Sequence, residues 1–376
     1  MNLYNKLKNK IFKYNGEIKK RNISLDYIRA LAILCVVVNH VVEEVYPLNI
    51  EFINNATLKI KIFCIGCFTF GRIGVPLFFM LTGYLLLTRE YDRDKTFNFY
   101  KHNVFPLIIV WEVWIFIYNV FGCWINATSF NIGEYLRRAF FLEHAGLPHT
   151  WYMPVIIGIY LFLPFVASVL QNMNGKILII LLLIIYFYLF VVPGINLWQS
   201  ALSVDSSSRV SNQIDLSFGG GIYGFYLILG YCFFKWKENR QHIFESARFY
   251  FITIIISIFL FIIIILSQIK LYVLDYEYSL WYDFFLLPLL GSCVFAFFLK
   301  EKKAIKMRCL FTEISKCAFG IYLVHELILI LCIENMKIYD KSMAVISLSI
   351  IVYFISLFVV ELLSLIPKIR YLLLKK

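Results

Sequence analysis

Long apolar runs alternate with short polar connections over most of the chain, between residues 25 and 366. A helix needs about 20 largely apolar residues to cross a bilayer, and runs of that kind predict about ten transmembrane helices here. The predicted spans are residues 25–45, 61–88, 104–124, 151–170, 176–193, 217–234, 249–268, 280–299, 317–334 and 343–366. The pattern therefore predicts an all-α polytopic integral membrane protein.

The second predicted span is the least regular of the set. Several glycines and Pro76 interrupt it, and Arg72 stands among them in Gly71-Arg72-Ile73-Gly74. Broken helices occur at membrane depth where the backbone lines a cavity. The pattern therefore predicts that this span is a broken helix beside a cavity.

The composition supports the membrane class and argues against several others. Hydrophobic residues make up 61% of the chain, the mean hydropathy is +0.75, and there are 37 Phe and 25 Tyr residues. Ordinary soluble domains do not reach such values. We find no internal repeat and no glycine-rich nucleotide motif. Cys64 and Cys67 form a lone Cys-x-x-Cys with no second pair or His cluster beside it, so the sequence predicts no metal and no permanently bound cofactor.

The distribution of positive charge predicts the orientation. With the N-terminus inside, 26 of the 36 Lys and Arg residues fall in cytoplasmic segments and 8 in external ones. This split follows the positive-inside rule and places both termini in the cytoplasm. The predicted parts are a basic N-terminal segment (1–24), a membrane domain (25–366) and a basic tail (367–376), in the plasma or inner membrane. The net charge of +12 thus reflects orientation and contact with membrane lipids, not nucleic-acid binding.

Arg29 and His40 are the strongest functional candidates. They lie eleven positions apart, so on a helix both side chains share one face, about 16 Å apart along the axis. Ionisable groups inside a bilayer are costly unless they face a cavity or a partner. The alternative is that Arg29 reaches the inner interface and His40 ends the span.

Further polar and aromatic residues fall in the outer half of the predicted spans or near mid-membrane. Arg72 lies in the second span, and His149, Trp151 and Tyr152 begin the fourth. For His149 and Trp151 an interfacial aromatic belt is the alternative interpretation. Tyr322 and His325 are three residues apart and share a helix face.

These segments together resemble the membrane acyltransferase-3 family. Residues 26–40 are similar to its opening motif, in which Arg or Lys precedes His by ten intervening residues, and residues 75–84 to its Phe-Phe-x-x-Ser/Thr-Gly segment. Trp151-Tyr152 followed by residues 160–164 is similar to the fourth-span segment, and residues 314–325 to the Tyr-x-x-His segment. Two positions depart from the pattern: Pro76 stands where many members have an acidic residue, and Glu326 where Pro is frequent.

The resemblance implies a ten-span enzyme that moves an acyl group, most often acetyl, from cytoplasmic acyl-coenzyme A to a hydroxyl of a surface polysaccharide or lipid-linked glycan. It implies His40 as general base or acyl carrier, with Arg29 and Arg72 as cationic groups of the catalytic site. The expected substrate-binding residues are Trp151, Tyr152, His149, Tyr322 and His325.

Two other functions are compatible with the residues alone. A polysaccharide exporter, flippase or other transporter would share the many spans, the broken helix and the buried charges. An accessory subunit that passes acyl groups to a separate transferase would share them too. For a transferase, we expect the run from Lys300 to Arg308 to attract the anionic donor or, alternatively, only to bind lipid heads.

Overall fold

The computed structural model describes residues 22–204, 209–211, 213–216, 220–300, 308–335 and 341–374. These residues form helices and no strands, as the sequence predicted. The basic segment 1–21 and the lysines Lys302, Lys303 and Lys306 lie outside the described residues.

The helices follow one another through the chain with short connections. They are α2 (Ile23–Val45), α3 (Ile50–Asn55), α4 (Leu58–Arg72), α5 (Gly74–Leu86), α6 (Arg93–Phe99), the π-helix η2 (Tyr100–Val104), α7 (Phe105–Ile125), α8 (Ile132–Ala139), α9 (Tyr152–Asn172), α10 (Gly175–Tyr186), the π-helix η3 (Phe187–Val191), α11 (Val192–Ala201), α12 (Gly221–Asn239), α13 (Gln241–Glu245), α14 (Ala247–Val273), α15 (Leu287–Phe298), α16 (Arg308–Asn335), α17 (Lys341–Ser364) and α18 (Pro367–Leu374).

Eight helical segments in the described residues are long and apolar enough to cross a membrane. They correspond to eight of the ten predicted spans, and the other two stay predictions. Of those two, α12 has three charged residues in its last turns, Lys235, Lys237 and Glu238. The other, α15, is a 12-residue apolar helix that begins at Leu287, so residues 280–286 of the predicted span 280–299 lie outside it.

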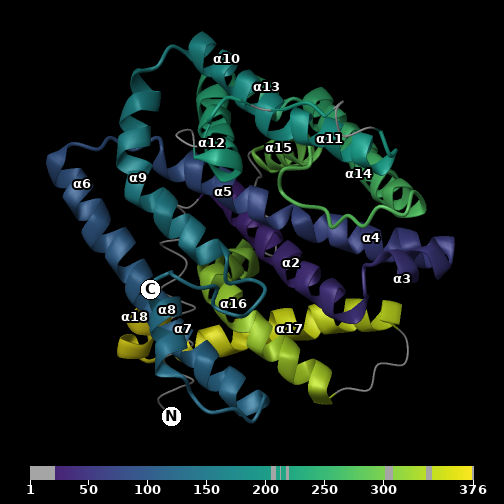
Figure 1. Cartoon of the computed structure of the whole chain (residues 1–376). Helices are drawn as coiled ribbons and strands as arrows, with labels where there is room; N and C mark the ends of the chain where they lie inside the picture. Colours follow the sequence, from purple (N-terminus) through teal and green to yellow (C-terminus); the bar gives the residue numbers. More distant parts are fainter. Residues whose placement is uncertain are drawn as a thin grey trace.

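Helix α2 is the central element of the fold. Its apolar side chains are largely buried, and it contacts α4, α5, α16 and α17. Figure 1 shows α2 in purple near the middle of the molecule, between the α4–α5 pair and the α16–α17 pair. By contrast, α14 exposes most of its apolar residues along its length, as a helix that faces lipid does.

The second span is broken, as predicted: α4 ends at Arg72 and α5 begins at Gly74. Glycines let the broken helix approach α2 closely, because a Cβ at Gly71 would lie 2.6 Å from Cβ of Asn39. A Cβ at Gly74 would lie 2.6 Å from the backbone oxygen of Ala32. The break therefore sits directly against α2.

Helices α5 and α12 are also in backbone contact. A Cβ at Gly83 would collide with the backbone oxygen of Leu227, and one at Gly230 with that of Met80. Small residues that bring helix backbones together are a common way to join membrane helices. Gly83 and Gly230 thus hold the second half of the broken span against α12.

Contacts between the connections divide them into two groups. Hydrogen bonds join Ser24 to Lys300, Gln171 to Arg89, and Lys237 to Leu299, all in or beside segments predicted to be cytoplasmic. Others join Asn54 to Asp275 and Tyr46 to Ser342, near predicted external connections. The grouping agrees with the charge count, whereas the cytoplasmic location of the first group stays a prediction.

The predicted tail is partly a helix that packs on the membrane domain. Helix α18 contacts α7 and α17, and Trp114 Nε1 donates a hydrogen bond of 2.9 Å to the backbone oxygen of Leu373. The Leu374 side chain is buried and lies close to Gly320 of α16. The end of the described chain is therefore part of the protein interior.

Candidate active site

A cavity of about 550 Å³ lies between α2, the broken span, α9 and α16. Arg29, Arg89 and Lys316 line it near the first group of connections, and Arg72 and Trp281 line it at the other end. His40 lies on its wall between them. One cavity thus contains both Arg29 and His40, which the helical spacing placed on one face.

His40 is held by a carboxylate of its own helix. Oε2 of Glu43 lies 3.2 Å from Nδ1 of His40 and accepts a hydrogen bond of 2.7 Å from Nδ2 of Asn39. The His40 side chain is buried apart from its contact with the cavity. A carboxylate at Nδ1 favours the tautomer with the proton on that nitrogen, which leaves a lone pair on Nε2.

Arg72 binds the other oxygen of the same carboxylate. Its Nη2 donates a hydrogen bond of 3.0 Å to Oε1 of Glu43, and its Nη1 one of 3.3 Å to the Tyr282 hydroxyl. The guanidinium carbon lies 4.6 Å from the ring centre of Phe68 and 5.0 Å from that of Trp281. Within the described part of the chain, Nε of Arg72 has no hydrogen-bond partner.

Arg29 connects α2 to α16. Its Nη1 donates a hydrogen bond of 2.7 Å to the Ser315 hydroxyl and lies 3.6 Å from Oδ1 of Asp26. The Ser315 hydroxyl in turn donates to the same carboxylate oxygen at 2.6 Å. This network directs the Arg29 guanidinium toward α16 at the cavity wall. The alternative interpretation, in which Arg29 only reaches the inner membrane interface, does not account for these bonds.

His149 is buried and lies just before α9, so it is not part of an exposed aromatic belt. The Tyr118 hydroxyl lies 3.1 Å from Nε2 of His149 and donates its own proton to the backbone oxygen of Leu323 at 2.8 Å. Nε2 must therefore carry the imidazole proton, and Nδ1 is left without a partner among the described residues. Burial, with His325 and His40 nearby, lowers the pKa of His149 well below its usual range and keeps it neutral.

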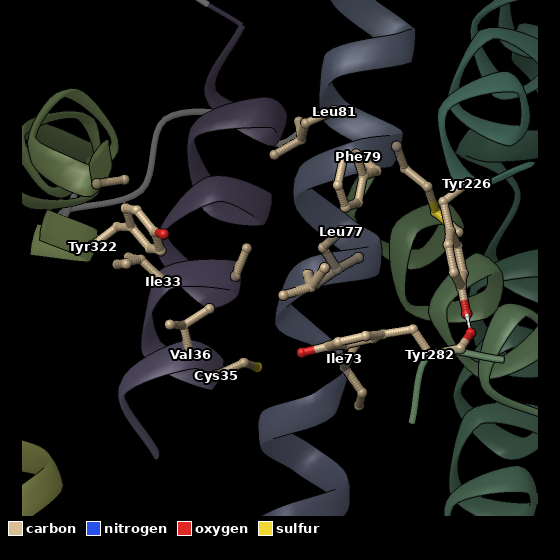
Figure 2. Close-up of a cluster of buried hydrophobic side chains, with 14 of the residues drawn as sticks. Ile33, Cys35, Val36, Ile73, Leu77, Phe79, Leu81, Tyr226, Tyr282 and Tyr322 are labelled. Carbon is tan, nitrogen blue, oxygen red and sulfur yellow. Dashed lines mark hydrogen bonds between the residues drawn. The ribbon is translucent and has the colours of Figure 1, made fainter. Parts of the chain in front are cut away.

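Aromatic side chains cover the other end of the cavity. Trp151 lies with its ring centre 5.5 Å from Trp281 and 5.4 Å from Tyr282. The Tyr226 hydroxyl donates a hydrogen bond of 2.8 Å to the backbone oxygen of Tyr282. Figure 2 shows the Tyr282 ring extending from this bond toward the break at Ile73. Trp281 is 37% exposed, so this aromatic end is open to the surroundings.

Tyr322 and Tyr152 line the cavity, whereas His325 lies behind its wall. The Tyr322 hydroxyl donates a hydrogen bond of 2.8 Å to the backbone oxygen of His149. The ring centres of His40 and His325 are 5.3 Å apart, and the His325 side chain is fully buried. A direct contact of His325 with substrate, as expected from the sequence, stays a prediction, because the described cavity wall does not include it.

Sequence reasoning missed three residues of this site. Glu43 follows His40 by three positions, a spacing that puts both on one helix face and was a usable signal. Trp281 and Tyr282 reach the cavity from the segment before α15, which was predicted to be the beginning of the span 280–299. Their approach depends on tertiary structure, and nothing in the local sequence pattern indicates it.

Comparison with known proteins gives one positive result. The family model described as an acyltransferase domain, of the acyltransferase-3 type, matches residues 22–366, nearly the whole chain. No curated protein and no solved structure matches the chain.

Proposed function

We propose that this chain, which belongs to the acyltransferase-3 family, is a membrane O-acetyltransferase that uses acyl-coenzyme A on the cytoplasmic side and acylates a hydroxyl of a surface polysaccharide or lipid-linked glycan. His40 is the central catalytic residue of this proposal. The observation that carries it is the contact between Glu43 and His40 on the wall of a cavity that also reaches Arg29.

In the direct form of the reaction, His40 is a general base. Nε2 takes the proton of the glycan hydroxyl while the hydroxyl oxygen attacks the thioester carbonyl carbon. The tetrahedral intermediate then breaks its carbon–sulfur bond, and the coenzyme A thiolate leaves with the proton from Nε2. Glu43 accepts a hydrogen bond from the Nδ1 proton and stabilises the imidazolium that forms between the two steps.

In the two-step form, His40 carries the acyl group. Nε2 attacks the thioester, coenzyme A leaves, and the proton on Nδ1 passes to Glu43 as the neutral acylimidazole forms. The glycan hydroxyl then attacks the acyl carbon and releases its proton to water, which balances the charge of the coenzyme A thiolate. The bond to Nε2 breaks, and Glu43 returns the proton to Nδ1. Both forms require the same orientation of the His40 ring, and the geometry supports either.

Arg72 has two roles in the proposal. It neutralises Glu43 and holds it against α2. Its Nε–H, which has no partner among the described residues, is a donor for the oxyanion that develops on the acyl carbonyl. A buried donor without a partner is uncommon, because it loses its hydration without compensation. A substrate oxygen would supply the missing acceptor.

The two ends of the cavity suit the two substrates. Arg29, Arg89 and Lys316 give the cytoplasmic end a positive field for the phosphates of coenzyme A. At the other end, Trp151, Trp281 and Tyr282 offer aromatic faces. Nδ1 of His149, which has no partner among the described residues, offers an acceptor for a glycan hydroxyl. The acyl group would thus meet the acceptor near His40.

The test combines a reaction assay with product analysis. Membranes that contain the protein are incubated with acetyl-coenzyme A labelled in the acetyl group, with and without lipid-linked glycan. We expect release of free thiol that depends on the glycan, and an ester-linked label on the glycan. Movement of glycan across the membrane with no thiol released would instead identify a transporter.

A further inference from the structure

Three buried groups that commonly bind metals meet beside the cavity: His40 of α2, and His325 and Glu326 of α16. Each offers one ligand atom, and the three atoms lie within 4.8 Å of one another. Oε2 of Glu326 is 3.7 Å from Nε2 of His325 and 3.9 Å from Nδ1 of His40. The side chains of His325 and Glu326 are 0% and 1% exposed.

Two of these ligand atoms are buried without a hydrogen-bond partner among the described residues: Nε2 of His325 and Oε2 of Glu326. Nδ1 of His325 lies 2.7 Å from the backbone oxygen of Tyr322, so the imidazole proton is on Nδ1 and Nε2 carries a lone pair. A lone pair of nitrogen and a carboxylate oxygen therefore face each other in the protein interior. Such an arrangement is unfavourable unless a cation lies between them.

A proton fits this gap less well than a metal ion does. The separations of 3.7 and 3.9 Å are longer than an N–H···O hydrogen bond. Zinc bonds to imidazole and carboxylate are about 2.0 to 2.2 Å long, which puts neighbouring ligands of a tetrahedral ion about 3.3 Å apart. The two separations that involve Glu326 exceed that spacing by only a few tenths of an ångström, and all three ligand atoms lie within 4.8 Å of one another.

The surroundings also match a zinc site. The second ring nitrogen of a zinc-bound histidine usually donates a hydrogen bond to a carbonyl or carboxylate oxygen, as Nδ1 of His325 does to the backbone oxygen of Tyr322. Two imidazoles and one carboxylate form a zinc ligand set, with the remaining position for water or substrate. His40 lies on the cavity wall, which puts this cluster directly beside the cavity.

We propose that His40, His325 and Glu326 form a binding site for a zinc ion. Sequence analysis predicted no metal site, because the ligands of α16 are far from His40 along the chain. If His40 acts as proposed above, a zinc ion on its imidazole removes the lone pair or the proton that catalysis needs. Zinc would then inhibit acyl transfer, and this consequence alone rests on the proposed function.

The experiment measures bound metal in the purified full-length protein. The protein in detergent is treated with a chelator, equilibrated with a slight excess of zinc sulfate, freed of unbound metal, and analysed by mass spectrometry for zinc per chain. We expect about one zinc ion per chain. Glu326→Gln keeps the side-chain shape and removes the anionic ligand, so zinc affinity should fall by about 10-fold to 100-fold or more.

His325→Gln is the second variant, and His102→Gln is the matched control, because His102 is exposed and outside the cluster. Zinc content at the wild-type level in both cluster variants, or none in the wild type, would overturn the proposal. The readout does not depend on activity. Acyl transfer by a wild-type protein that binds no zinc would remove the metal site alone. Zinc binding by a protein whose chelated, zinc-free form shows no transfer would remove the enzyme assignment alone.

Discussion

Glu43 lies one turn after His40 on α2 and brings a carboxylate oxygen to 3.2 Å from the Nδ1 atom of that histidine. The second oxygen of the carboxylate accepts a hydrogen bond from Arg72 on the broken span. The carboxylate is thus fixed from both sides, and it fixes the imidazole in turn. This relationship joins α2 to α4 at the level where the chemistry is proposed to occur.

Substitution Glu43→Gln should lower kcat by roughly 10-fold to 100-fold, with a smaller change in the Michaelis constants, because Gln keeps the shape but stabilises an imidazolium poorly. Glu44→Gln is the control, since Glu44 is exposed on the next position. Initial rates of thiol release measure both. Equal rates in the wild type and Glu43→Gln would mean that Glu43 has only a structural role.

His40→Ala should reduce acyl transfer by at least about 100-fold while the protein still inserts and accumulates, because the loss removes the proton acceptor or nucleophile but little apolar surface. His144→Ala serves for comparison, as His144 lies exposed in the connection before α9. Ester-linked acyl groups on the cell-surface glycan report the outcome. Wild-type acylation in His40→Ala would exclude the proposed role.

Arg29→Ala should raise the Michaelis constant for acyl-coenzyme A about 10-fold, a loss of ~1.4 kcal/mol in donor binding. Arg29→Lys should recover part of this, because a point charge remains while the bond to Ser315 is lost. Donor titrations of both variants measure the effect. Unimpaired donor binding in both would assign Arg29 to the membrane interface.

Gly83→Ala should destabilise the protein by about 1–3 kcal/mol, because the added methyl group would collide with the backbone of α12 at Leu227. Gly158→Ala in α9 is the matched control, because no described atom beyond its chain neighbours and the nearby backbone of its own helix lies within 4 Å of the added Cβ. Thermal unfolding in detergent compares them. A midpoint for Gly83→Ala at or above that of Gly158→Ala would contradict the close approach of α5 and α12.

Cysteine labelling should place Asn98→Cys in the cytoplasm and Thr128→Cys outside, since the positive charge lies mostly on the side of residue 98. Both positions are exposed, and a background that lacks the exposed Cys309 avoids its signal. An impermeant maleimide applied to intact cells should label residue 128 only. The reverse pattern would invert the orientation and the proposed side of the donor.

The sequence predicted those parts of the structure that depend on local spacing. Hydropathy located the eight long apolar segments, and the glycines with Pro76 located the break in the second span. Helical geometry alone put Arg29 and His40 on one face, and both line the cavity.

The sequence could not predict relationships that depend on long-range packing. Glu326 approaches His40 because α16 lies against α2, and no local pattern encodes that neighbour. The segment before α15 was taken as part of a span because Leu280, Trp281 and Tyr282 are apolar or aromatic. In the structure the Trp281 and Tyr282 rings instead pack on Trp151 and Arg72, so the apolar character of this segment did not indicate a helical conformation.

The glycine contacts between α5 and α12 also limit how the protein can move. Two helices whose backbones touch cannot slide or separate without losing that fit, so they behave as one rigid unit. The wall of the cavity formed by α5 therefore moves only together with α12. Any widening of the cavity therefore involves movement of this unit as a whole or of the other helices that line it, among them α7, α9 and α18.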